Sequence, residues 1–289
     1  TVRDPNTPPT NPKMPESSPY WADEVIWTSK NNVHNPMLDH KGRVWLTSTI
    51  RPTANPPECK AGSSHPSAKL FPVDNASRHL AVYDPATKKL THIGTCFGTH
   101  HLMFAEDANH TLWTSGGGQV IGWLNTKMFD ETQDEMKSQG WTALIRDANG
   151  NGKRDAYTEP DQPLDPSKDQ RVGGALYAVA PAPDGSVWGT QLGYPGMIIR
   201  LAPGSNPPDT ALVEVYQPPV DKGFSPRGGD VDPDGVYWAA MASGHLASFD
   251  RRKCKGSLNG PKASGLHCPE GWTFYTEPAP QFKNVTDSG

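Results

Sequence analysis

Residues 35–48 read NPMLDHKGRVWLTS, a pattern that the chain goes on to repeat. A short apolar strand leads into a turn of Asp, Asn or Gly, and a second strand carrying a tryptophan follows. Two such strands around a tight turn are typical of a β-hairpin. The same order recurs in HLMFAEDANHTLWTSG (101–116), YAVAPAPDGSVWGTQ (177–191) and GGDVDPDGVYWAAMASG (228–244).

A second hairpin follows each of these first hairpins. Four strands per unit, repeated along the chain, predict the blades of a β-propeller. We therefore predict an all-β fold of four-stranded blades, with four repeats visible and more in a longer natural chain. The second hairpins read HLAVYDPATKKLTHI (79–93), VIGWLNT (120–126) with GWTALIRD (140–147), MIIRLAPGSNPPDTALVEVY (197–216) and HLASFDRRKC with GWTFYTE (245–277).

Each repeat carries one tryptophan at the same place, and we expect these side chains to fill the space between neighbouring sheets. They are Trp45, Trp113, Trp188 and Trp238. The first two intervals exceed the roughly 40–50 residues of a blade, so both units carry insertions.

The predicted organisation is one propeller domain over residues 21–289, after an extended Pro-rich arm at 1–20. Insertions are expected at 51–78 and 127–172, with one short surface helix at 127–138. The end of the chain shows no strand that would close the ring, so we expect part of the natural chain to be absent. The alternative is a small closed propeller in which a strand at 24–28 completes the last blade.

Composition excludes several classes of protein. The 289 residues include 28 Gly, 30 Pro and nine Trp, which indicates many turns around a core. Net charge is −4 with both signs interspersed, and mean hydropathy is −0.64. We therefore expect no nucleic-acid partner and no membrane span.

The four cysteines form two separated groups without a C-x-x-C pair, which disfavours zinc. We predict disulfides Cys59–Cys96 and Cys254–Cys268, with free thiols as the alternative. Disulfides indicate an oxidising compartment, and so a periplasmic or extracellular protein. No signal peptide is visible, and we expect a mature chain or one cut at its start.

The segment DANGNGKRD (147–155) has the spacing of a calcium loop. Side-chain oxygens fall on alternate positions, and Gly152 provides the sharp turn at the sixth position. No EF-hand glutamate stands at position 12, where the residue is Thr158. We predict a structural calcium ion here; the alternative is an Asn/Gly-rich turn without metal. The expected ligands are Asp147, Asn149, Asn151, the carbonyl of Lys153, Asp155 and Glu159.

Several histidines stand just before the first strands of the repeats, where a propeller usually binds its ligand. They are His34, His100 and His101, with Arg227 and Gly173-Gly174 at the corresponding places of the later repeats. Three imidazoles and a guanidinium converging on one axis could bind a second divalent metal, an anion or a carboxylate, or supply a general base. The alternative is that each imidazole bonds a nearby carbonyl. His79 and His245 both begin second hairpins, which indicates a structural role.

The unit D-x-x-G-x-x-W-x-T-S resembles the streptogramin (virginiamycin B) lyase-like β-propellers over residues 33–277, and more loosely the NHL and gluconolactonase-like propellers. The whole chain is also similar to secreted bacterial members of that superfamily that share GTHHLMF, DANGNGKRD and SGHLASFDRRKC segments. The resemblance implies a lyase with a magnesium site and a general base. It also implies an acidic residue and a histidine shortly after a tryptophan strand, and Thr47-Ser48, Thr114-Ser115, Thr190-Gln191 and Ala240-Met241 stand there instead.

Three functions remain open. The first is a metal-assisted lyase- or hydrolase-like enzyme in which His34, His100, His101 and Arg227 act at the channel on a small molecule or peptide. The second is a non-catalytic extracellular module that binds or assembles with a protein partner. The third is a lactonase-like calcium hydrolase, which requires acidic residues inside the channel.

Overall fold

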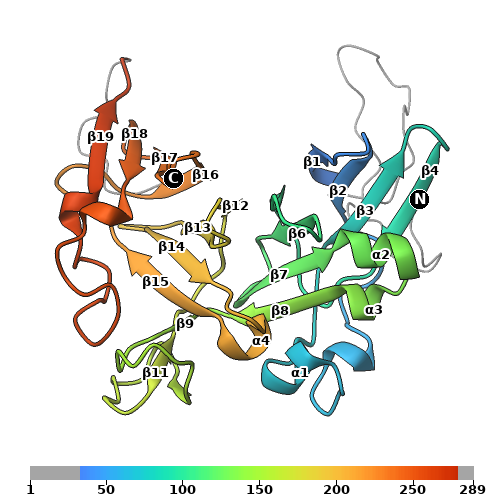
Figure 1. Ribbon diagram of the computed structural model, residues 1–289, viewed down its shortest axis with the longest axis horizontal. Helices are drawn as coiled ribbons and strands as arrows, with labels where there is room; N and C mark the ends of the chain where they lie inside the picture. Colours follow the sequence, from blue (N-terminus) through green and yellow to red (C-terminus); the bar gives the residue numbers. More distant parts are fainter. Residues whose placement is uncertain (1–32, 279–289) are drawn as a thin grey trace, which may run out of the picture.

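The computed structural model describes residues 33–278 as four sheets, each with four antiparallel strands of the predicted kind. Each sheet contains two hairpins, and the sheets follow one another along the chain as blades 1 to 4. Figure 1 shows them side by side in an arc, with the open side between the first and last blade. The fold is therefore a propeller-like row of blades, and no ring closes within the described range. The predicted arm at 1–20 and the strand at 24–28 lie outside it.

The strands match the predicted hairpins closely. Blade 1 contains β1 (Val33–Leu38), β2 (Val44–Ser48), β3 (His79–Asp84) and β4 (Lys89–Ile93), and blade 2 contains β5 (Leu102–Phe104), β6 (Thr111–Thr114), β7 (Val120–Asn125) and β8 (Gln139–Ala143). Blade 3 contains β12 (Val179–Pro181), β13 (Val187–Gln191), β14 (Met197–Ala202) and β15 (Leu212–Tyr216), and blade 4 contains β16 (Pro226–Val231), β17 (Tyr237–Met241), β18 (His245–Phe249) and β19 (Trp272–Thr276).

The repeated D-x-x-G-x-x-W pattern has a direct structural reason in the first and last blades. One carboxylate oxygen of Asp39 accepts the N–H groups of Lys41 and Arg43, and the other accepts the indole N–H of Trp45 at 2.9 Å. Asp232 does the same for its own turn and for Trp238, at 2.8 Å. The aspartate thus fixes the turn and orients the tryptophan that follows.

The tryptophan of each of the first three blades packs against the next blade. Trp45 joins blade 2 side chains such as Leu112 and Leu124, and Trp113 joins the core of blade 3. Trp188 lies 5.4 Å, between ring centroids, from Tyr237 of blade 4. These three are buried, whereas Trp238 is only partly buried and stacks on Tyr275 of its own sheet. The tryptophan of a blade is thus fully buried, as expected, only where a following blade packs against it.

The insertion at 51–78 contains a 3-10 turn, η1 (Pro57–Cys59), and a short helix, α1 (Pro66–Leu70). Cys59 pairs with Cys96, as predicted. The expected helix at 127–138 is two helices, α2 (Thr126–Thr132) and α3 (Glu135–Ser138), because Gln133 adopts a left-handed conformation with φ of 55° and ends the first one.

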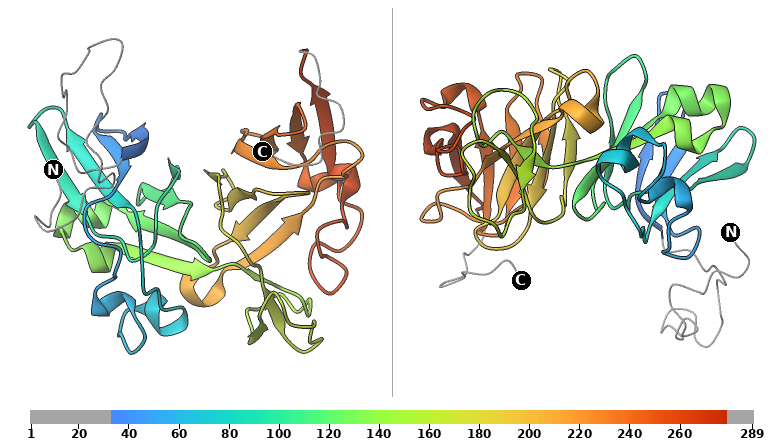
Figure 2. Two further views of the ribbon diagram at one scale, coloured as in Figure 1. Left: turned by 180° about the vertical axis from the view of Figure 1, so that it is seen from behind. Right: turned by 90° about the horizontal axis from the view of Figure 1, so that it is seen from below.

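The rest of the second insertion extends blade 3 outward. β9 (Ile145–Arg146) pairs with β15, and β11 (Asp169–Arg171) and β10 (Tyr157–Thr158) follow it, which gives a seven-stranded sheet. Figure 2 shows this extension on the convex side of the arc. The remaining short elements are α4 (Pro207–Thr210), η2 (Arg251–Lys253) and η3 (Pro269–Gly271), and Cys254 pairs with Cys268 as predicted. In residues 33–278 the longest helix has seven residues, far short of a membrane crossing.

Trp45 and Trp238 provide a matched test of packing between blades, because both bond the turn aspartate and only Trp45 is fully buried. We expect Trp45→Ala to lower the free energy of unfolding by about 3–5 kcal/mol, and Trp238→Ala to cost less than half of that. Urea unfolding followed by circular dichroism measures both values. Equal losses for the two variants would contradict the assignment of Trp45 to an interface between blades.

Candidate functional site

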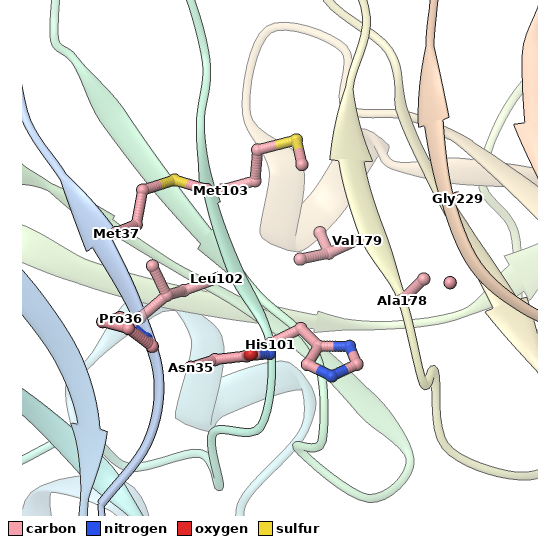
Figure 3. A pocket seen from close by; sticks show the side chains of 10 residues that line it. Asn35, Pro36, Met37, His101, Leu102, Met103, Ala178, Val179 and Gly229 are labelled. Atoms are coloured by element: carbon pink, nitrogen blue, oxygen red, sulfur yellow. The ribbon is translucent and has the colours of Figure 1, made fainter.

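The first strand of every blade lies on the concave side of the arc, and these four strands line one pocket. The pocket has a volume of about 290 Å³ and is lined by residues of β1, β5, β12 and β16 and by residues next to them. Figure 3 shows Met37 and Met103 together at one end and His101 at the other, with Val179 and Ala178 opposite. The predicted location of the ligand-binding mouth is thus where the structure has a cavity.

His34, His100 and His101 come together beside this pocket. Each offers one ring nitrogen, and these three atoms lie within 4.8 Å of one another. The ring centroids of His34 and His100 are 4.5 Å apart, and those of His100 and His101 are 4.2 Å apart. The Nε2 atom of His34 is buried without a hydrogen-bond partner. Within the described range this is the single group of at least three His, Cys, Asp or Glu side chains with metal-binding spacing.

Hydroxyl groups from the tryptophan strands hold the backbone of this site. Thr47 Oγ1 donates to the carbonyl of His34 at 2.6 Å. Ser115 Oγ accepts the N–H of His101 and donates to the carbonyl of Tyr177 in the next blade. Thr190 Oγ1 donates to the carbonyl of Arg227. Thr47, Ser115 and Thr190 stand where the lyase resemblance implies an acidic residue and a histidine. Their hydroxyl groups position the backbone of the candidate site.

Tyr177 belongs to the site although the sequence interpretation placed Gly173-Gly174 there. Its ring centroid lies 4.6 Å from that of His101 and 5.2 Å from that of His100. Arg227 reaches the same ring, with its Cζ atom 5.9 Å from the centroid. The position of each blade relative to its tryptophan strand identifies Tyr177 as the equivalent of His100. Met103 faces Trp113 and Ala180 faces Trp188, and counting three residues back from each gives His100 and Tyr177.

The electrostatic environment keeps two of the imidazoles neutral. Burial, together with the neighbouring His100 and His34, lowers the pKa of His101 to about 4. Burial and His34 also lower the pKa of His100, and the Tyr177 carbonyl only partly opposes this. Neutral imidazole is the form that binds a metal ion, because its ring nitrogen then keeps a free lone pair.

The calcium-type loop lies far from this pocket, at the outer extension of blade 3. The Asp147 carboxylate is buried and accepts the N–H groups of Gly150, Asn151 and Gly152. The amide Nδ2 atoms of Asn149 and Asn151 both donate to Asp155 Oδ2. Lys153 takes part through its N–H, which donates to Asn151 Oδ1. The loop is thus closed around Asp155.

Glu159, which the sequence offered as the last ligand, is held elsewhere. Its Oε2 accepts from Arg171 Nε at 2.8 Å, and Arg171 Nη2 also donates to it. The structure therefore leaves the Glu159 side chain outside the hydrogen-bond network of the loop.

No model of a known protein family matches the chain, and no curated protein sequence matches it. Among solved structures, the chain is similar to a catalytically inactive variant of virginiamycin B lyase from Staphylococcus aureus, bound to quinupristin. The TM-score is 0.46 and the identity 13%, over 86% of this chain and 57% of the lyase chain. The chain thus spans little more than half of the lyase.

Two further structures are similar in fold. One is PorZ, a surface component of the type-IX secretion system of Porphyromonas gingivalis, with a TM-score of 0.44 and 14% identity over 98% of this chain and 30% of that chain. The other is a gluconolactonase from Xanthomonas campestris, with a TM-score of 0.36 and 13% identity over 81% of this chain and 64% of that chain. These neighbours agree with the resemblance to lyase-like β-propellers, and similarity at this level assigns no activity.

His101 gives the site a predictable pH dependence. Its pKa is lower in the folded protein, about 4, than the ordinary value of 6.5, so the unfolded chain binds more protons between these two pH values. Stability should therefore fall as pH drops through this window, and His101→Gln should reduce the fall. Urea unfolding of both proteins at several pH values from about 7 to 4 checks this. Parallel pH profiles for wild type and variant would contradict it.

Proposed function

We propose that His34, His100 and His101 bind a divalent transition metal at the mouth of the pocket, and that this centre serves a lyase- or hydrolase-like reaction. The observation that carries the proposal is the approach of three ring nitrogens, one from each histidine, and the His34 side chain among them has a buried Nε2 without a hydrogen-bond partner. A tetrahedral site with metal–nitrogen bonds of about 2.0–2.1 Å has nitrogens about 3.3 Å apart. The nitrogens would have to move closer together, and the rings turn out of their stacked arrangement, when a metal binds.

The surrounding side chains fit an anionic or carbonyl substrate. A bound divalent metal would polarise a substrate oxygen or lower the pKa of water. Arg227, held beside the Tyr177 ring, would bind a carboxylate or a developing negative charge. Met37, Met103 and Val179 would contact an apolar part of the substrate, such as a peptide side chain. The substrate class is thus a small molecule or peptide with an acidic or carbonyl group next to an apolar group.

The two other functions are less well supported. A lactonase-like calcium hydrolase needs acidic ligands in the channel, and none of the residues that line the pocket within 33–278 is acidic. A binding module remains the alternative. It predicts that the cluster of His34, His100 and His101 binds no metal ion. The two disulfides favour a periplasmic or extracellular location for either function.

For the loop at 147–155 we propose a structural calcium ion, separate from the histidine centre. The support is the spacing of its oxygen-bearing side chains and the buried Asp147 carboxylate. The loop lies on the convex side of the arc, so the ion would stabilise the insertion and take no part in the reaction.

Metal binding tests the proposed centre directly. We expect the purified chain to bind one equivalent of Co²⁺ or Zn²⁺, and His34→Gln or His100→Gln to weaken this binding at least about tenfold, because each removes one ligand. Isothermal titration and the visible spectrum of the Co²⁺ form measure it.

The control is His245→Gln, since His245 bonds Ser243 on blade 4 and lies outside the cluster. This variant should bind metal like the wild type. Equal metal binding by the wild type and all variants would contradict the proposed metal centre and favour the binding module. With the centre established, screening of ester, lactone and peptide substrates with the wild type and Arg227→Gln follows.

A further inference from the structure

One buried carboxylate near the calcium-type loop has no role in the functions proposed so far. Asp169 begins β11, in the same insertion as the loop but well beyond it in the sequence. It is 1% exposed, and its Oδ2 accepts the N–H of Asp155 at 2.8 Å. Its Oδ1 is buried and has no hydrogen-bond partner. A buried charged oxygen without a partner is costly, so it indicates a missing ligand.

Two other carboxylates, those of Asp147 and Asp155, lie close enough to Asp169 to act on it through their charge, although the three are not at metal-binding spacing in this structure. In residues 33–278 no salt bridge includes any of the three aspartates. Within the described range these carboxylates thus accept hydrogen bonds from N–H groups and have no cationic side chain in direct contact.

The two nearest arginines are occupied elsewhere. Arg146 donates to the carbonyls of Gly260 and Ala263 and to Gln170, and Arg154 donates to Thr142 and the carbonyl of Ala211. Both are close enough to interact with Asp169 through their charge. They therefore moderate the potential without forming an ion pair with it.

We propose that Asp169 is a ligand of the divalent cation held by the loop at 147–155, in the place that the sequence assigned to Glu159. The inference rests on the proposed calcium site and specifies its ligands. Asp147, Asp155 and Asp169 supply carboxylate oxygens, the donor type that calcium prefers. Asn149 and Asn151 now direct Nδ2 toward Asp155, and their Oδ1 atoms accept the N–H groups of Asn151 and Lys153. A half-turn of each amide would present Oδ1 to the cation in exchange for those two backbone bonds.

A ligand on β11 gives the ion a wider structural effect than a loop-only site would. β11 pairs with β9, whose Arg146 holds the carbonyls of Gly260 and Ala263. The carbonyl of Asp147 also accepts the N–H of Gly260 at 2.8 Å. Gly260 and Ala263 lie in the loop that the Cys254–Cys268 disulfide closes. The cation therefore fixes the surface on which this loop of blade 4 rests.

Two near-isosteric variants separate Asp169 from Glu159. We expect the full-length wild type, stripped of metal, to bind one Ca²⁺ by isothermal titration. Asp169→Asn should weaken the binding about 30-fold or more, since it removes a charged ligand, while Glu159→Gln should change it less than about threefold. Circular dichroism without calcium confirms that each variant is folded. In addition, anomalous diffraction from a calcium-grown wild-type crystal should place the ion about 2.3–2.6 Å from the Asp169 carboxylate.

The outcomes distinguish this inference from the calcium proposal on which it rests. If the wild type shows neither heat nor a rise in Tm with about 10 mM CaCl₂, well above the affinity range of extracellular calcium modules, both fail. If the wild type binds calcium and Asp169→Asn binds it equally well, or if the ion lies away from Asp169 in the crystal, only the ligand assignment fails. If Asp169→Asn does not fold, the crystal of the wild type decides the question alone.

Discussion

Packing of one tryptophan against the following sheet is the interaction on which the rest of this structure depends. Trp45, Trp113 and Trp188 each join a core shared with the next blade. The hairpin repeat places an indole at the same point of every sheet, and a buried indole contributes more contact area than any other side chain. Each blade thus packs on the next one in a similar orientation, and the row of blades forms an arc.

The candidate site follows from this arrangement. Because the blades stack in register, equivalent positions at the start of their inner strands lie next to one another on the concave side (Figure 1). His34, His100, Tyr177 and Arg227 occupy such positions in blades 1 to 4, and hydroxyl groups of the tryptophan strands hold three of their carbonyls. No single blade contains the site, so the spacing of its groups depends on the packing between blades.

Much of the fold could be predicted from the sequence, because hairpins and turns are local. The four-stranded units, the two disulfides and the meeting of His34, His100 and His101 follow from repeat positions and cysteine grouping. Ring closure could not be predicted this way, since it requires contact between the first and last blades, which are far apart in the sequence. The prediction of a single helix at 127–138 was wrong. Gln133 adopts a left-handed conformation there, which the sequence does not indicate because the residue is not a glycine or an asparagine.

The candidate site could be predicted less completely, for two physical reasons. Tyr177 was not predicted because Gly173 and Gly174, four and three residues earlier, were interpreted as the equivalents of His100. The pairing of Ala180 with Trp188 sets the correct position at Tyr177. Asp169 was not predicted because the fold, and not the sequence spacing, brings it beside Asp155. The spacing of a linear calcium motif favoured Glu159, which instead bonds Arg171.

The loop closed by Cys254–Cys268 rests on the segment that the proposed cation would organise. Both constraints depend on the surroundings: a disulfide needs an oxidising medium, and a loop with the weaker affinities of extracellular modules fills only at high calcium. In a reducing medium low in calcium the two constraints would be lost together, so this surface of the fold would respond to conditions that the packing between blades does not sense.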